Sequence, residues 1–142
     1  MVTLIVFMAI EYIDINKMIP PKFGLPDNPE KDEKLIELIT KAEKKEIPVY
    51  EGIVDINAIK PFCTYKPKDK DLQRSRPGFI KDLHEGNPRF LLTYQEGDKL
   101  IMSDDYYAYY LYVNEDFVKI PCVILGETTL TCIENRILST WS

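Results

Sequence analysis

Two adjacent carboxylates come nearest to a catalytic pattern in this chain. Asp104 and Asp105 follow Ser103 in a polar turn between an apolar run and a tyrosine-rich segment. Such a turn opens a helix, whose first N–H groups and positive dipole attract anions. We interpret the turn first as a helix cap, made by Ser103 or Asp104, because these residue types cap well. The alternative is that Asp104 and Asp105 hold Mg²⁺ beside a substrate phosphate.

The other residues that commonly perform catalysis are sparse. The chain has one histidine, His84, and three well-separated cysteines, Cys63, Cys122 and Cys132. One histidine cannot build a His-based zinc site, and the cysteines lack metal-ligand spacing, although a disulfide stays open. We find no glycine-rich phosphate loop, Ser-His-Asp set or Cys-His set. The sequence therefore predicts no catalytic residues and no cofactor, with magnesium only in the enzyme alternative, and a reduced cytoplasmic setting.

A lysine-rich segment supplies the candidate nucleic-acid-binding residues. Its five basic side chains are Lys66, Lys68, Lys70, Arg74 and Arg76. The segment shows no hydrophobic periodicity and ends at Pro77-Gly78, so we expect a mobile basic loop over residues 63–78. Such a loop could contact the phosphates of DNA. The net charge of −5 and pI of about 5.0 argue against a basic footprint over the whole surface.

Five of the nine tyrosines lie in one short segment, residues 106–112. They cannot all face a core, so we interpret the segment as an amphipathic helix with packed rings and outward hydroxyls. The alternative is an interface to another protein or to a second copy, with Tyr106, Tyr109 and Tyr110 as candidates. A base-stacking platform would need interleaved Arg or Lys, and residues 104–117 have none.

Size and composition predict one soluble globular domain over residues 1–142. The chain is 45% hydrophobic and 29% charged, which is ordinary for such a domain. The apolar run over residues 1–10 is too short to span a membrane and lacks the features of a signal peptide. We therefore expect a strand or a poorly ordered leader there, and no membrane partner.

The hydrophobic patterns place the expected elements along the chain. A helix with Asn28 as its cap and Pro29 as its first residue buries Leu35, Leu38, Ile39 and Ala42 on one apolar face. The remaining elements are extended or helical segments, namely a strand over 49–56, a short helix over 79–84, a hairpin over 91–102, a helix over 104–113 and a strand over 120–125. The tail over 128–141 fits helix and strand equally. The motif Ile13–Pro20, an apolar strand stopped by proline, recurs as Val54–Pro61.

This order of elements resembles the ParB and sulfiredoxin-like fold. The family begins with an apolar-Asp-apolar strand and a proline, as in Val54–Pro61, and continues with a helix, a hairpin, a polar loop, a helix and an apolar strand near a Val/Ile-Pro. The resemblance implies an α+β fold, a small mixed sheet packed with two or three helices. The family's signature loop, Asp-Gly-His-His-Arg, binds nucleotide phosphates. It aligns with residues 104–108, where only Asp104 matches, Asp105 replaces the glycine and Ala108 replaces the arginine.

The leading functional hypothesis is a degenerate ParB-like nuclease domain that acts as a non-catalytic binding or accessory module. Its partner would be DNA, through the basic segment, or another protein, through the tyrosine segment. The second hypothesis is a metal-dependent nuclease or nucleotide-dependent phosphotransferase that uses Asp104 and Asp105. The third is a structural protein that forms homo-oligomers through the tyrosine helix.

Overall fold

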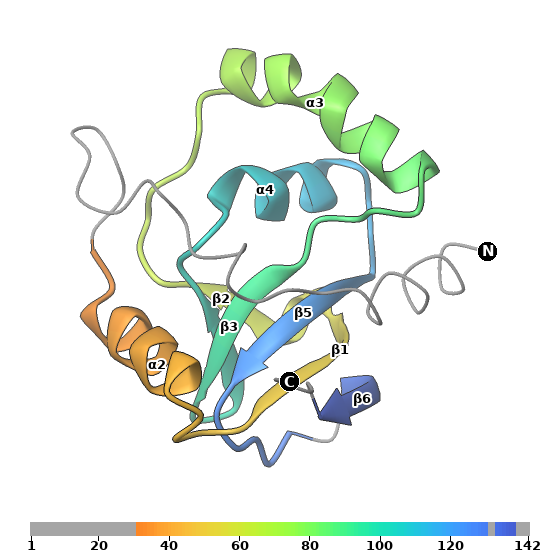
Figure 1. Ribbon diagram of the computed structural model, residues 1–142. Helices are drawn as coiled ribbons and strands as arrows, with labels where there is room; N and C mark the ends of the chain where they lie inside the picture. Colours follow the sequence, from red (N-terminus) through yellow and green to blue (C-terminus); the bar gives the residue numbers. More distant parts are fainter. Residues whose placement is uncertain (1–30, 131–132, 139–142) are drawn as a thin grey trace.

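The computed structural model describes residues 31–130 and 133–138 (Figure 1). The expected element over residues 1–10 and the motif Ile13–Pro20 lie outside the described residues. The described helices and strands, in chain order, are α2 (Glu33–Glu43), β1 (Val49–Asp55), the 3-10 turn η2 (Ile56–Ala58), β2 (Ile59–Pro61), α3 (Asp69–His84), β3 (Leu91–Glu96), β4 (Lys99–Met102), α4 (Tyr106–Asn114), β5 (Lys119–Leu125) and β6 (Ile133–Leu138).

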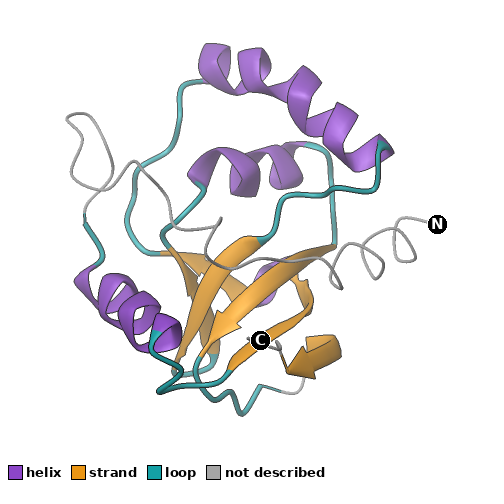
Figure 2. Ribbon diagram, viewed as in Figure 1, coloured by secondary structure: helices purple, strands orange, loops and turns teal. Residues whose placement is uncertain are grey.

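The strands form one mixed sheet with the order β2-β4-β3-β5-β1-β6 (Figure 2). The β2–β4 and β3–β5 pairs are parallel. The β3–β4, β1–β5 and β1–β6 pairs are antiparallel. The α+β class and the mixed sheet predicted from the sequence are thus confirmed, and so is the predicted number of two or three helices among the described residues.

The central strands are buried on both faces, because each face of the sheet is covered by a helix. In β5, Cys122 and Ile124 belong to the core beneath α4, whereas Val123 and Leu125 belong to the core beneath α2. Alternate side chains point to opposite faces of a strand, so a strand covered on both faces is apolar at every position. This explains why Lys119–Leu125 contains an unbroken apolar run.

Helix α2 uses the apolar stripe that the sequence predicted. Leu35, Ile39 and Ala42 are buried against the sheet. The start of this helix differs from the prediction, because α2 begins at Glu33 and its N-cap is Asp32, whose carboxylate accepts the N–H of Leu35. The predicted start at Asn28 lies outside the described residues.

Helix α3 corrects the prediction of a loop over residues 63–78. Only residues 63–68 are non-helical, and the helix continues through Pro77. A proline inside a helix costs roughly 3 kcal/mol, because it removes one hydrogen bond and crowds the preceding turn. Leu72 and Phe79, on either side of Pro77, are both buried. Burial of each side chain contributes roughly 2 kcal/mol, so tertiary packing offsets the cost of the proline. This packing is why the helix continues through Pro77, where the sequence alone predicted that it could not.

The helices α3 and α4 form two layers above one face of the sheet. Helix α4 lies on the sheet, and α3 packs on α4 as the outermost layer (Figure 1). The Phe79 ring of α3 meets the Tyr112 ring of α4 edge-on, with ring centroids 4.8 Å apart. One long face of α3 is therefore held by α4, and the other is open to solvent.

Two further predictions concern the hairpin and the tail of the chain. The turn between β3 and β4 contains Gly97 in the left-handed region, with φ of 65°, as the predicted hairpin requires. The tail, which fitted helix and strand, contributes the edge strand β6 next to β1. No helix among the described residues is long and apolar enough to cross a membrane.

Candidate nucleic-acid interface

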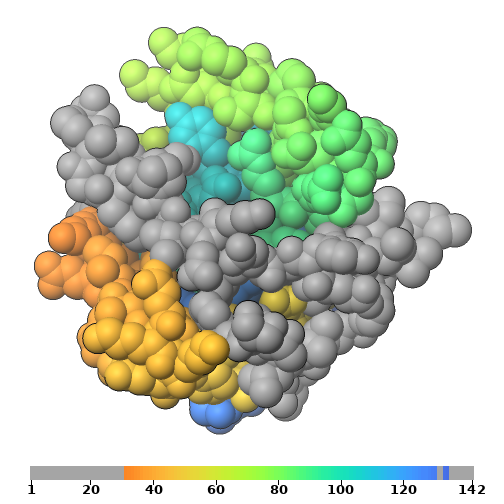
Figure 3. All heavy atoms as spheres, viewed as in Figure 1, coloured from red at the N-terminus to blue at the C-terminus, as the bar shows by residue number. Residues whose placement is uncertain are grey.

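The open face of α3 carries a line of cations. Lys70, Arg74 and Lys81 are exposed and follow the spacing i, i+4 and i+11, which places them on one side of a helix. The buried Leu72 and Phe79 occupy the opposite side. We call Lys70, Arg74 and Lys81 the outer stripe. In the space-filling view α3 forms the upper edge of the described part of the molecule (Figure 3).

The ion pairs of the outer stripe are loose. The Arg74 Nη1 atom lies 3.7 Å from the Asp71 carboxylate, and the Lys81 Nζ atom lies 4.0 Å from the Glu85 carboxylate. Exposed pairs of this kind contribute little free energy and are screened by salt. A phosphate group can therefore replace these carboxylates as the partner of either cation at little cost.

Arg76 takes a different role from Arg74, although both belong to the predicted binding set. The Arg76 guanidinium forms an ion pair with Glu115, the residue that ends α4. The hydrogen bond from Arg76 to Glu115 and the attraction between their charges raise the pKa of Arg76. Arg76 thus fastens α3 to α4, and although its side chain is exposed, its charge is already paired within the fold.

Two predicted basic residues precede the helix. The Lys66 ammonium lies 5.4 Å from the centroid of the Tyr110 ring, which is the geometry of a cation–π contact. Lys68 is the N-cap residue of α3, and its side chain makes no capping hydrogen bond. Both are exposed and adjoin the N-terminal end of α3, but neither belongs to its helical face.

The tyrosine helix is largely covered. Tyr106 is 3% exposed, and its hydroxyl lies 3.3 Å from the Cys63 Sγ atom. Burial, followed by this hydrogen bond, raises the pKa of Tyr106. Tyr106 therefore cannot belong to an exposed interface, which corrects its place in the predicted set. Tyr109 and Tyr110 are half-buried, with ring centroids 4.9 Å apart, and they retain some exposed surface.

The Asp104-Asp105 turn acts as a helix cap, but the capping residue differs from the prediction. Asp105 is the N-cap of α4, and its Oδ1 atom accepts the N–H of Ala108 at 2.9 Å. Asp104 is half-buried at the preceding position. Among the described residues, no group of three or more His, Cys, Asp or Glu side chains is placed to hold a metal ion.

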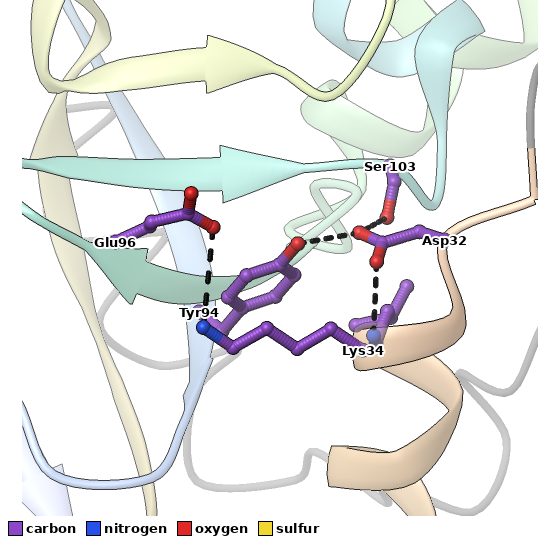
Figure 4. Close-up of polar contacts among 6 residues, drawn as sticks. Asp32, Lys34, Tyr94, Glu96 and Ser103 are labelled. Atoms are coloured by element: carbon purple, nitrogen blue, oxygen red, sulfur yellow. Dashed lines mark hydrogen bonds and ion pairs between the residues drawn. The ribbon is translucent and has the colours of Figure 1, made fainter.

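Ser103 instead joins a buried polar cluster with Asp32 and Tyr94 (Figure 4). The Asp32 Oδ2 atom accepts the Tyr94 hydroxyl at 2.7 Å and the Ser103 hydroxyl at 2.8 Å. The Lys34 ammonium lies over the Tyr94 ring and 3.9 Å from Glu96. Burial and the bond to Asp32 raise the pKa of Tyr94. The cluster ties the start of α2 to the turn before α4, and its groups are used within the fold.

Sequence reasoning missed three residues of the open face. Gln73 and Gly78 share this face with the outer stripe, and Lys81 ends it. The signal was the spacing between Lys70, Arg74 and Lys81, which is regular for a helix. It was hidden because Pro77-Gly78 suggested that the helix begins only at Phe79.

Comparisons with known proteins give likenesses of structure only. No family model matches the chain, and no curated protein matches it. Sulfiredoxin from Arabidopsis thaliana aligns with a TM-score of 0.45 and 10% identity, over 55% of this chain and 86% of that chain. The C-terminally truncated chromosome-partitioning protein ParB from Caulobacter crescentus, complexed with CTP-gamma-S, aligns with a TM-score of 0.44 and 8% identity, over 56% of this chain and 46% of that chain.

These two proteins represent the two groups that the sequence pattern resembles. The likeness concerns the backbone arrangement over about half of this chain, and the alignment spans less than half of the ParB chain. It says nothing of ligands or activity here.

Proposed function

We propose that this chain is a non-catalytic nucleic-acid-binding module that contacts the phosphate backbone through the outer stripe of α3, in the cytoplasm. The observation that carries the proposal is the line of exposed cations along one side of α3. Lys70, Arg74 and Lys81 line one exposed side of the helix, whereas Arg76, which is also exposed, is paired with Glu115 of the neighbouring helix end. A line of cations on one face of an exposed helix is the electrostatic footprint of backbone binding.

The length of the outer stripe fits a row of phosphates. Lys70 and Lys81 are eleven residues apart, which corresponds to about 16 Å along a helix. Three neutralised phosphates give a slope of about −3 when the logarithm of the binding constant is plotted against that of the salt concentration. Because the whole chain has a net charge of −5, binding depends on this local stripe and should weaken steeply with salt.

The test is fluorescence anisotropy of a labelled duplex between low and physiological salt. The variant Lys70→Glu, Arg74→Glu, Lys81→Glu should lose binding across this range. The matched control is Lys31→Glu, Lys44→Glu, Lys45→Glu, which changes the net charge equally at exposed positions outside α3. Equal losses in both variants, or binding by neither the wild type nor the control, would remove the proposal.

A further inference from the structure

The open face of α3 contains more than cations. Between Lys70 and Lys81 it presents Gln73, Pro77 and Gly78 beside Arg74, and all of these residues are exposed. Arg and Gln are the side chains that make paired hydrogen bonds to the major-groove edges of guanine and adenine, respectively. Their position at the centre of the face, with a lysine toward each end, separates groups suited to bases from groups suited to phosphates.

Gly78 is not required by the fold of the chain itself. It lies inside α3, and a Cβ atom built on it would meet nothing within 4 Å. Because this space is open, packing within the chain does not require a glycine at position 78. Glycine inside a helix also costs about 1 kcal/mol of stability relative to alanine, so its presence needs another reason. A glycine on an open face allows another molecule to approach the backbone closely. The adjacent Pro77 also projects little beyond the helix.

The dimensions of the helix fit one kind of nucleic acid. A helix with its side chains is about 10–12 Å wide, and the B-form major groove is about 12 Å wide, so entry favours small residues on the inserted face. The major groove of A-form RNA is too narrow for side chains to read. Helix α3 is the outermost layer and can approach a groove without obstruction from α4, which lies on its other side (Figure 1).

We infer that α3 enters the major groove of B-form DNA, with Lys70 and Lys81 on phosphates and Gln73 at a base edge. Arg74 contacts a phosphate in unselected DNA and turns to a base edge at the preferred site. This inference rests on the proposed function and deepens it, because it names the nucleic acid and adds reading of sequence. Gly78 and Pro77 set the depth of insertion. The acidic side chains beside this face are Asp71, 3.7 Å from Arg74, and Glu85, 4.0 Å from Lys81, and both of these loose ion pairs open when the cations turn to DNA.

The experiment is selection from a random duplex library with the full chain, followed by sequencing of the bound fraction. The wild type should enrich a short motif that contains guanine and adenine. Arg74→Lys keeps the charge but removes the paired hydrogen bonds, so it should lose the preference at one position by roughly 5- to 150-fold. Its affinity for unselected duplexes should change less than about twofold. Gln73→Ala should relax a neighbouring position.

A second series tests the insertion itself. Gly78→Leu should weaken binding to the selected site by at least about tenfold while circular dichroism shows an intact helix, because leucine is a strong helix former. Gly78→Ala is the graded variant and should weaken binding less than Gly78→Leu, because its side chain is smaller. A double-stranded RNA of the same length should compete only weakly.

The outcomes separate the two proposals. Salt-dependent binding without any enriched motif, an unchanged motif in Arg74→Lys, unchanged binding by Gly78→Leu, or RNA competing as well as DNA would each overturn major-groove reading and leave backbone binding standing. Failure of the wild type to bind any nucleic acid would remove both.

Discussion

The Ser103 hydroxyl donates to the Asp32 carboxylate at 2.8 Å, although the two residues are 71 positions apart. Asp32 is 1% exposed and Ser103 is 5% exposed. The same carboxylate also accepts the Tyr94 hydroxyl and the N–H of Leu35 in the first turn of α2. One buried charge therefore satisfies three donors from three separate elements, and the turn before α4 is held by the start of α2.

Replacement of Asp32 by alanine should destabilise the protein by about 3 kcal/mol. The loss combines a missing N-cap, worth about 1 kcal/mol, with two buried hydroxyls left without an acceptor. Asp32→Asn retains an acceptor oxygen and should lose less. Urea unfolding, monitored by circular dichroism, measures the stability of both Asp32 variants. Glu43→Ala, at an exposed position of α2, is the control. A loss below about 1 kcal/mol in Asp32→Ala would show that the cluster contributes little.

Arg74→Ala and Arg76→Ala should separate binding from folding. Arg74 faces solvent on the outer stripe, so its loss should weaken DNA binding and reduce the salt slope by about one. Arg76 pairs with Glu115, so its loss should leave the slope unchanged and increase hydrogen exchange in α3. Anisotropy titrations and hydrogen exchange measure the two effects. The reverse assignment of effects would contradict the orientation of α3.

High pH should unfold the protein through its buried tyrosines. Burial raises the pKa values of Tyr94, Tyr106 and Tyr112 above the ordinary value near 10. A raised folded pKa means that the stabilisation is complete below pH of about 10 and is lost as pH rises further. Above that pH, each buried tyrosine should lower the free energy of unfolding by about 1.4 kcal/mol per pH unit until its raised pKa is reached.

The measurement is the unfolding free energy at several alkaline pH values, beside tyrosinate absorbance. Tyr112→Phe should reduce the slope of stability against pH, since one ionisable group is removed. It should also lower stability at neutral pH by about 1 kcal/mol, because the 2.6 Å hydrogen bond to the Arg89 carbonyl is lost. Ionisation of all tyrosines while the protein stays folded would refute this account.

Two glycine replacements should have opposite effects on stability. Gly97 has φ of +65°, where a side chain is strained, so Gly97→Ala should destabilise the hairpin by about 1 kcal/mol. Gly78 lies in a helix with open space at its Cβ, so Gly78→Ala should stabilise by up to about 1 kcal/mol. Thermal unfolding of both variants and the wild type shows whether each replacement raises or lowers the stability. Destabilisation by Gly78→Ala would indicate a contact that the structure does not contain.

The sequence by itself determined the elements whose signals are local. The unbroken apolar run of β5, the glycine turn between β3 and β4, and the apolar stripe of α2 each act over a few residues, and each formed where the pattern predicted. The apolar run of a buried strand and the apolar face of a helix are both patterns of this short range. The Asp104-Asp105 turn was likewise correctly predicted as a helix start, although the capping residue is one position later.

Tertiary structure decided the helix through Pro77 and the direction of each charge on it. The burial of Phe79 against Tyr112 offsets the cost of the proline, and that partner lies in another helix. Arg76 pairs with Glu115, which lies 39 residues further along the chain, so no local pattern could reveal this contact. The basic segment was therefore visible in the sequence, but the division between cations that face solvent and one that secures the fold arises only when distant residues meet.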